Sequence, residues 1–326
     1  MEGNEVGTRI VAIGNALMDI FAFVGIDLPE SLGYRTNGVS HLEAGSLDKL
    51  IARLDKQAAM AAGGGAANTV RAASLLGVEC GFIGTVGDDE FGRRYRRDLE
   101  NVGVKVLLSI HPLPTGVFCA LIHPDHGRTI LVAPGAAPLV SMSRCDFERR
   151  RGDILYIDGF ALAGGRLLEE EGPKARAAGM LIAIDLGSKQ LVQTHRQALL
   201  DSIREYCDFV FANEEEFLCL GGSSIEGTCQ ALSEFGCTFV VKKGERGAVF
   251  CREGLRVESP VRAQQPLDET GAGDAFAAGY LAAFSRGFAP ELCLRLGNRL
   301  AEEAIAVPGL GLATDRIRQL RSSFGL

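Results

Sequence analysis

Several short segments of this chain are apolar along their whole length, and longer segments with a helical pattern separate them. A strand without polar alternation is typical of a parallel sheet that helices cover on both faces. The repeated order of strand and helix therefore predicts βαβ units and an α/β fold with a mostly parallel central sheet. The expected strands are residues 9–13, 154–157, 180–184, 208–211 and 238–241.

Residues 16–44 and 105–135 depart from this order. In the second segment, strand-like residues 116–122 and 128–132 flank a Pro-Asp-His-Gly turn, which predicts an antiparallel hairpin. Because both segments interrupt the βα pattern, we expect them to pair as a small β-sheet lid. The predicted large domain comprises residues 1–15, 45–105 and 135–326, and the predicted lid comprises residues 16–44 and 106–134.

The charge balance argues against a large anionic partner. Lys plus Arg number 34 against 41 Asp plus Glu, which gives a net charge of −7 and opposes binding to nucleic acid or a membrane surface. The basic run at residues 93–97 is diluted by neighbouring acids and is typical of a solvated helix face. The first eight residues are polar, and no long apolar segment is present. We expect a cytoplasmic protein that acts on small molecules.

The nine cysteines form no CxxC pair, and their number is odd. This pattern predicts reduced thiols, most of them in the core, rather than a disulfide framework or a zinc site. His123 and His126 lie in the expected hairpin turn without further candidate ligands, so we interpret them as loop residues.

The segment DETGAGD, residues 268–274, precedes a small and apolar helical segment. Glycines at a helix start let backbone amides approach an anion, and the helix dipole adds partial positive charge there. Asp274 can act as a helix cap, or it can take a proton from a hydroxyl that attacks a bound phosphate. The local pattern leaves both interpretations open.

A second glycine cluster, GGGAAN at residues 63–68, also opens a helical segment, and by itself it is equally typical of a tight helix entry. Asn15 and Asp19 follow the first strand, at the sheet edge where open α/β folds bind ligands. Asn213 and Glu216 follow a later strand and fit either helix-dipole compensation or the ordering of magnesium-bound water.

Two common nucleotide-binding patterns are missing from the sequence. The GxxxxGK[ST] loop of Walker-type ATPases is absent, and no GxGxxG follows the first strand. The second absence argues against an oxidoreductase with a standard dinucleotide-binding fold.

These motifs, in this order and over nearly the whole chain, resemble the ribokinase-like (PfkB) family of carbohydrate and nucleoside kinases. Residues 63–68, followed by 75–77 and 84–92, are similar to its first signature. Residues 268–274 resemble its second, the DxTGAGD pattern, and residues 304–309 resemble its closing segment. Asn213 with Glu216 is similar to its NxxE element.

The resemblance implies a three-layer α/β/α fold with a β lid, and in-line transfer of the γ-phosphoryl group of ATP to a hydroxymethyl group, with Mg²⁺. It makes Asp274 the general base and the amides of Gly271, Ala272 and Gly273 the anion hole. It assigns the acceptor to Asn15, Asp19, Gly64, Gly65 and Asn68. It assigns ATP to Asn213, Glu216, Gly244, Gly247 and Asn298, with Glu216 reaching Mg²⁺ through water. In some members a monovalent cation such as K⁺ lies beside the residues matching Asp268 and Thr270.

The acceptor is expected to be a sugar or a ribonucleoside. The spacing of Asn15 and Asp19 with GGxxxN resembles adenosine kinases, although Gly65 stands where those enzymes often have Ser. Lys242 stands where the family often has a nucleotide-contacting Thr. Candidates to stack on a base are the lid aromatics Phe21, Phe23 and Phe118. A noncatalytic sugar or nucleoside sensor of the same fold is the alternative function, and either a monomer or a homodimer through the lid fits the sequence.

Overall fold

The computed structural model describes residues 8–43, 45–54, 58–125, 127–141, 148–163, 167–262, 266–307, 312 and 314–326. Pro308 and Gly309 of the closing segment, His126 and Cys145 lie outside these ranges. Among the described residues, no helix is long and apolar enough to span a membrane.

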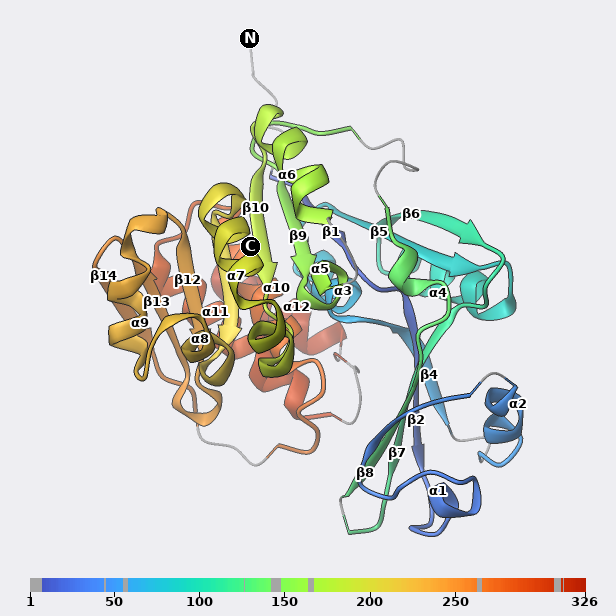
Figure 1. The fold of residues 1–326 in the computed structure, drawn as a ribbon. Helices are drawn as coiled ribbons and strands as arrows, with labels where there is room; N and C mark the ends of the chain where they lie inside the picture. The colour runs from blue at the N-terminus through green and yellow to red at the C-terminus, as the bar shows by residue number, and fades with distance from the viewer. Residues whose placement is uncertain are drawn as a thin grey trace.

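A nine-stranded sheet forms the centre of the molecule (Figure 1). In spatial order its strands are β14 (Leu255–Ser259), β13 (Ala248–Arg252), β12 (Thr238–Lys242), β11 (Phe209–Asn213), β10 (Leu181–Asp185), β9 (Ile154–Asp158), β1 (Ile10–Ile13), β5 (Cys80–Gly87) and β6 (Val104–His111). Neighbours are parallel, except that β13 runs antiparallel to both β12 and β14. The predicted α/β class with a mostly parallel sheet is therefore confirmed.

Helices cover both faces of this sheet, as the apolar strands predicted. One buried cluster joins the sheet to α6 (Leu167–Ala177), α7 (Lys189–Tyr206), α8 (Glu214–Gly221) and α9 (Ile225–Ala231), with α5 (Gly159–Ala163) beside them. The other cluster joins it to α3 (Gly65–Leu75), α4 (Glu90–Glu100), α10 (Ala272–Phe284), α11 (Pro290–Ile305) and α12 (Thr314–Phe324). The result is the expected three-layer α/β/α arrangement.

A second, five-stranded sheet extends away from the main body at the lower right of Figure 1. Its order is β3 (Val39–His41), β8 (Arg128–Ala133), β7 (Gly116–Ile122), β2 (Leu17–Phe23) and β4 (Ala59–Gly63). Strands β7 and β8 form the predicted antiparallel hairpin. The short helices α1 (Leu28–Ser31) and α2 (Ser46–Ile51) accompany this sheet.

Two strands pair differently from the predicted division of the chain. Strand β4 lies in the range assigned to the large domain but pairs with β2 in the second sheet. Most of β6 lies in the range assigned to the lid but pairs with β5 in the central sheet. The sequence AMAAG of β4 contains no β-branched residue, so it carries little strand signal. Apart from these two strands, the division into domain and lid stays a prediction.

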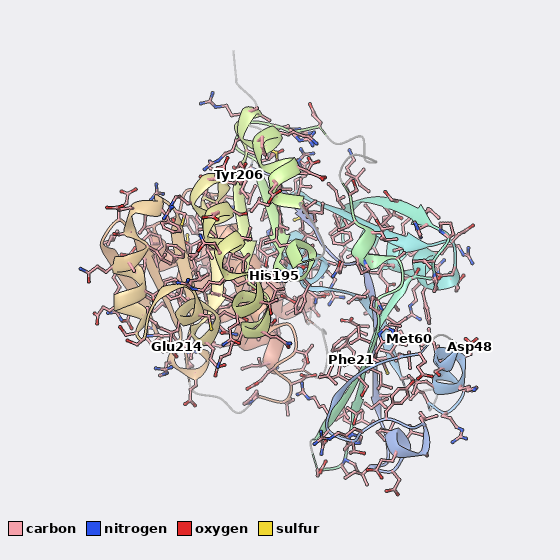
Figure 2. The ribbon with its side chains drawn as sticks, in the orientation of Figure 1. Phe21, Asp48, Met60, His195, Tyr206 and Glu214 are labelled. Carbon is pink, nitrogen blue, oxygen red and sulfur yellow. A yellow bond between two sulfur atoms is a disulfide. The ribbon has the colours of Figure 1, made fainter. Side chains whose placement is uncertain are left out.

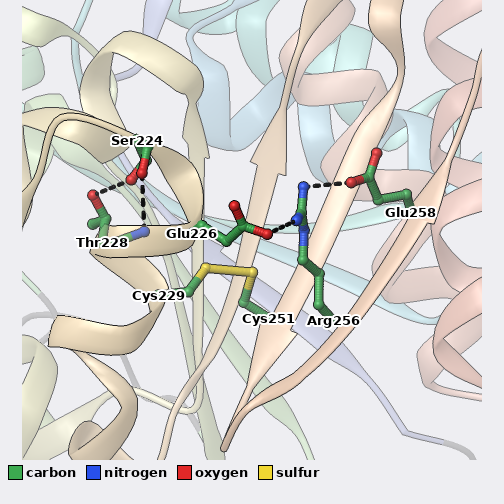
Figure 3. The surroundings of a disulfide bond; sticks show 8 residues. Ser224, Glu226, Thr228, Cys229, Cys251, Arg256 and Glu258 are labelled. Carbon is green, nitrogen blue, oxygen red and sulfur yellow. Dashed lines mark hydrogen bonds and ion pairs between the residues drawn. A yellow bond between two sulfur atoms is a disulfide. The ribbon is translucent and has the colours of Figure 1, made fainter.

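Cys229 of α9 and Cys251 of β13 form a disulfide, with Cα atoms 6.2 Å apart (Figure 3). The prediction that all the cysteines are reduced thiols is therefore wrong for this pair. The two residues are 22 positions apart, and only the packing of α9 beside the sheet brings them together. The other described cysteines are free thiols, at positions 80, 119, 207, 219, 237 and 293.

Helices α10 and α11 approach closely through their glycines. A Cβ built on Gly279 would lie 2.7 Å from the carbonyl oxygen of Leu296 and 2.9 Å from the Cα of Gly297. A Cβ on Gly297 would in turn lie 2.9 Å from the carbonyl oxygen of Phe276. Backbone atoms cannot yield as a flexible side chain can, so this contact fixes the position of α10.

We expect Gly279→Val to lower the free energy of unfolding by about 1–3 kcal/mol, because the added atoms overpack the helix contact. Urea unfolding followed by circular dichroism measures this change. Gly221→Ala is the matched control, since its new Cβ would meet no atom closer than 3.9 Å. Equal stability of the two variants would contradict the close packing of α10 on α11.

Candidate active site

Polar residues stand at the carboxyl ends of five neighbouring strands of the central sheet. Asn15 follows β1, and Asp158, Asp185, Asn213 and Lys242 end β9, β10, β11 and β12. Strand β1 pairs with β5 on one side and with β9 on the other, so the order of the strands along the chain reverses at β1. Open α/β sheets bind ligands at such a reversal of strand order, and the second sheet extends from this edge in Figure 1.

Helix α10 begins with backbone amides directed to this edge. Its N-cap residue, Gly271, has φ 74°, a left-handed conformation that favours glycine. No side chain caps the helix. Asp274 therefore does not act as a helix cap, which was one of the two roles that the sequence allowed. The amide of Ala272 donates to the carbonyl of Glu269 at 3.2 Å. Among the described residues, no backbone hydrogen bond of a turn or loop occupies the amides of Gly271 and Gly273.

Asp274 instead joins the two glycine motifs. Its Oδ2 accepts a hydrogen bond of 3.0 Å from Nδ2 of Asn68, although the two residues are 206 positions apart. Gly65 lies against the other oxygen, because a Cβ there would be 3.2 Å from Oδ1 of Asp274. Asn68, Thr270 and Gly271 also line a small cavity between α3 and the start of α10.

The environment of Asp274 favours a proton-accepting role. Burial raises the pKa of its carboxyl group to about 7, with a further increase from Asp185. The hydrogen bond from Asn68 and the charge of Lys242 act in the opposite direction. A carboxylate with a pKa near the working pH is a more effective proton acceptor than an ordinary aspartate.

The acceptor residues predicted from the sequence lie together on the lid side of Asp274. The Asp19 side chain on β2 is only 4% exposed and lies against Gly63. Burial raises its pKa to about 8, and the nearby Arg71 opposes this shift. Gly64 has φ 90° and fits where a Cβ would come within 2.2 Å of the carbonyl oxygen of Asn15.

Two buried amide oxygens among the predicted acceptor residues have no hydrogen-bond partner in the described part of the chain. Oδ1 of Asn15 and Oδ1 of Asn68 are both buried, and no described residue donates a hydrogen bond to either. A buried acceptor without a donor is costly, so both atoms are suited to a ligand that brings hydroxyl donors. The free oxygen of Asn68 belongs to the same amide whose nitrogen holds Asp274.

Asp158 is a site residue that the sequence analysis missed. Its carboxylate accepts from the amides of Ala161 at 2.9 Å and Ala66 at 3.4 Å. Burial raises its pKa to about 6, although these hydrogen bonds lower it. Asp158 therefore connects β9 to the start of α3, and its position at the end of an apolar strand was the available signal.

Asn213 and Glu216 form a complete capping box at the start of α8. The Asn213 amide nitrogen donates to Oε2 of Glu216 at 2.8 Å, its side-chain nitrogen donates to Oε1 at 2.8 Å, and its Oδ1 accepts from the Glu216 amide at 2.9 Å. Burial and the charge of Asp185 raise the pKa of Glu216. The geometry therefore agrees with the helix-start interpretation. To order magnesium-bound water, Asn213 and Glu216 would have to use the oxygen lone pairs that these hydrogen bonds leave free.

Asp185, which the sequence analysis missed, pairs with Lys242, which the sequence places where the family often has a nucleotide-contacting Thr. Nζ of Lys242 donates to Oδ2 of Asp185 at 2.6 Å. Asp185 ends an apolar strand, as Asn213 does. The rule that ligands bind at the carboxyl ends of parallel strands could therefore have found it as well.

The remaining nucleotide-side residues lie further along the same edge. Gly244 and Gly247 belong to the turn between β12 and β13, where the Lys243 amide donates to the Gly247 carbonyl at 2.7 Å. Asn298 is buried on α11, and its Nδ2 donates to the carbonyl of Ser259 at 2.9 Å. Gly247 also contacts this carbonyl, because a Cβ there would lie 2.1 Å from it.

Arg128 connects the second sheet to the glycine loop. From β8 its guanidinium lies 3.0 Å from Oδ1 of Asp268 and donates to Oγ1 of Thr270 at 3.2 Å. Asp268 also accepts from the Thr270 amide at 2.9 Å. A guanidinium therefore stands where the sequence suggested a monovalent cation, and the cation itself stays a prediction.

The predicted stacking aromatics differ in their exposure. Phe21 is only 8% exposed and pairs with Ala59 in the second sheet (Figure 2), whereas Phe23 is 73% exposed. The sequence missed Phe160, which follows Asp158 and is 54% exposed. Its ring lies over the backbone of Gly187, where a Cβ would be 3.3 Å from it.

No group of three or more His, Cys, Asp or Glu side chains in the described part of the chain could hold a metal ion. Beside nucleotides Mg²⁺ is commonly held by phosphate oxygens and water together with one or two protein carboxylates, so it does not need such a group.

A glycine-rich helix start beside a buried carboxylate is the arrangement expected of α/β enzymes that transfer a phosphoryl group to a small molecule. Residues 31–316 match the pfkB family of carbohydrate kinases. The chain therefore belongs to this family.

Relatives across most of the chain are also kinases. Adenosine kinase of Saccharomyces cerevisiae is 26% identical over 334 residues, which cover 94% of this chain and 98% of that protein. Aminoimidazole riboside kinase of Salmonella typhimurium is 31% identical over 291 residues, covering 81% and 89%. The crystal structure of adenosine kinase from Sinorhizobium meliloti superposes with a TM-score of 0.82 at 27% identity, covering 96% and 99%. The predicted ribokinase-like fold is thus confirmed.

Proposed function

We propose that this chain transfers the γ-phosphoryl group of ATP to the hydroxymethyl group of a ribonucleoside. The observation that carries this proposal is the hydrogen bond between Asn68 and Asp274, which brings the acceptor motif to the phosphate-binding helix start. A base placed between a hydroxyl pocket and an anion site is what phosphoryl transfer to an alcohol requires.

In this mechanism Asp274 takes the proton of the acceptor hydroxyl as its oxygen attacks the γ-phosphorus. Asp19, Asn15 and Asn68 hold other hydroxyls of the acceptor and so orient the attacking one. The amides at the start of α10, foremost those of Gly271 and Gly273, stabilise the negative charge on the phosphoryl oxygens. Mg²⁺, when bound with ATP, neutralises phosphate charge, and Glu216 with Asn213 would contact its water shell.

Arg128 has a separate role in this proposal. It is the lid residue that reaches the glycine loop, through Asp268 and Thr270. We assign it to holding the second sheet closed over the acceptor, so that water is excluded while the phosphoryl group is transferred.

Phe160 supports a nucleoside over a simple sugar as the acceptor. The ring of Phe160 follows Asp158 by two residues and is 54% exposed, so it offers a face on which a base can stack. A monosaccharide has no flat group to use this surface. The named activities of the yeast and Sinorhizobium relatives agree with this choice.

The raised pKa of Asp274 sets the expected pH dependence. Asp274 must be deprotonated to work, and Asp19, with a pKa raised to about 8, must be ionised to hold two hydroxyls, so kcat/KM should rise with pH through about 7 and level off only above about 8. Steady-state rates measured with ATP and Mg²⁺ in constant excess test this. A profile that stays flat from about pH 5 to 8 would contradict a base with a raised pKa.

A phosphorylation panel tests the proposed function. Purified protein is incubated with ATP and Mg²⁺ and either adenosine, inosine, ribose, fructose or 2-keto-3-deoxygluconate, and products are identified by mass. We expect a nucleoside monophosphate. A phosphorylated sugar alone would keep the kinase but overturn the nucleoside assignment. Ligand-induced thermal stabilisation without any product would favour the noncatalytic sensor.

A further inference from the structure

Lys242 is a charged residue at the phosphate side of the site to which the mechanism above gives no task. It ends β12, and its register partner on β11 is Asn213. The lysine side chain is only 17% exposed, and that of its partner Asp185 only 11%. Holding a lysine in such a place costs solvation energy, so we asked what the ammonium group does there.

The ammonium group is held in one position and kept charged. Its Nζ donates to Oδ2 of Asp185 at 2.6 Å, while Oδ1 of Asp185 accepts from the Gly187 amide at 3.1 Å. Burial alone would lower the pKa of Lys242, but Asp185, with smaller contributions from Glu216 and Asp274, raises it. The residue therefore carries a full positive charge at every physiological pH.

The same ammonium group borders the start of α10. A Cβ built on Gly273 would lie 3.2 Å from Nζ of Lys242, so the charge stands beside one of the two free amides of the anion site. It also acts on the carboxyl group of Asp274, whose pKa it lowers. Lys242 thus lies close to the anion site at the start of α10 and acts on the carboxyl group of the proposed base.

The hydrogen-bonding capacity of Lys242 is not filled. An ammonium group has three N–H donors, and Asp185 is the acceptor that Nζ finds among the described residues. The remaining donors have no protein acceptor in that part of the chain, and the neighbouring surface is made of backbone amides that also seek an anion. An anionic oxygen placed beside Gly273 could accept hydrogen bonds from both the ammonium group and these backbone amides.

We propose that Lys242 is a catalytic residue that contacts the phosphoryl group during its transfer, and that Asp185 positions it. This rests on the proposed kinase function. As the acceptor oxygen forms its bond to the γ-phosphorus, the bond to the β,γ-bridging oxygen breaks and its electron pair leaves with ADP. The acceptor proton goes to Asp274, while Lys242 donates hydrogen bonds to the oxygens that carry the developing charge. A charge that is fixed before the reaction begins stabilises the transition state without reorganisation.

Lys242→Met tests the proposal, because methionine keeps an unbranched side chain of nearly the same length without the charge. We expect kcat with adenosine to fall about 100-fold or more, as when a preorganised donor to a transition-state oxygen is lost, and KM for adenosine to change little. Lys243→Met is the matched control, since the Nζ of Lys243 pairs with Glu258 at 2.8 Å instead. A folded Lys242→Met enzyme with kcat within about threefold of wild type would overturn the proposal.

Calorimetric titration with Mg²⁺ and either β,γ-imido-ATP or ADP separates a phosphoryl contact from a structural role. We expect Lys242→Met to weaken the imido-ATP complex about tenfold or more and the ADP complex much less, because ADP lacks the transferred group. Equal weakening of both complexes would mean that Lys242 only supports the nucleotide site.

Asp185→Asn provides a second variant that leaves the lysine in place. We expect it to lower kcat about tenfold and to weaken imido-ATP more than ADP, since the ammonium group loses its anchor. Unchanged kcat and unchanged binding of both nucleotides would contradict the positioning role of Asp185. This test holds even if Lys242→Met does not fold. The binding experiments need no turnover, so an inactive wild type would refute the proposed function without deciding the contact of Lys242.

Discussion

Asp274→Asn should reduce phosphoryl transfer by about 10²–10⁴-fold, the range expected for loss of a general base. Asparagine fits the same space and can still accept the hydrogen bond that Asn68 donates to Asp274. It cannot take a proton from the acceptor hydroxyl, so we expect kcat to fall while the affinity for ATP changes little. Initial rates at saturating ATP and acceptor, together with calorimetric ATP titration, measure the two quantities.

Asp315→Asn is the control for this substitution. Asp315 also lies in the first turn of a helix, α12, but its side chain is 89% exposed. If first-turn charge alone mattered, both variants would behave alike. Near-normal turnover of a folded Asp274→Asn enzyme would show that another group accepts the proton.

Asp19→Asn should lower kcat/KM for the acceptor by about 10- to 100-fold. The carboxylate is buried and, in our proposal, accepts hydrogen bonds from two neighbouring hydroxyls, whereas an amide offers one acceptor and one donor. Hydrogen bonds to a charged group contribute about 1.5–3 kcal/mol each, which sets this range. The loss should depend on the acceptor concentration and leave KM for ATP nearly unchanged.

Asp48→Asn is the matched control, since Asp48 lies on the exposed surface of α2 beside the second sheet (Figure 2). We expect it to behave as wild type. If Asp19→Asn affected ATP and acceptor equally, the assignment of Asp19 to the hydroxyl pocket would be wrong.

Local patterns in the sequence were sufficient for the central sheet. A strand buried on both faces has to be apolar throughout, so β9, β10 and β12 were visible as short uninterrupted runs. The glycine motifs were visible for a similar reason, because a helix start that receives an anion needs residues without side chains. Strand β4 was missed because alanine and methionine favour helix and glycine weakens a strand, so the run gives no strand signal.

The contacts that complete the site were not visible in this way. Lys242 and Asp185 are 57 positions apart, and Arg128 and Thr270 are 142 apart. Lys242, Asp185 and Arg128 are, taken alone, ordinary charged side chains at the end of a strand or in a hairpin, and Thr270 is an ordinary loop residue. Only the order of strands in the sheet, and the position of the second sheet, make them neighbours.

The same reasoning applies to the disulfide between Cys229 and Cys251. Cysteine spacing predicts pairing when it follows a known framework, and these two residues follow none. Their proximity depends on how α9 packs beside β13, which no short segment of the sequence specifies.

The most direct measurement of the central claim is the ratio of ADP formed to acceptor phosphorylated, with adenosine, ATP and Mg²⁺, for wild type and Asp274→Asn in parallel. Our account predicts one ADP for each adenosine monophosphate produced by the wild type, and almost none of either from the variant. ADP released without a phosphorylated acceptor, or equal product from both proteins, would contradict it.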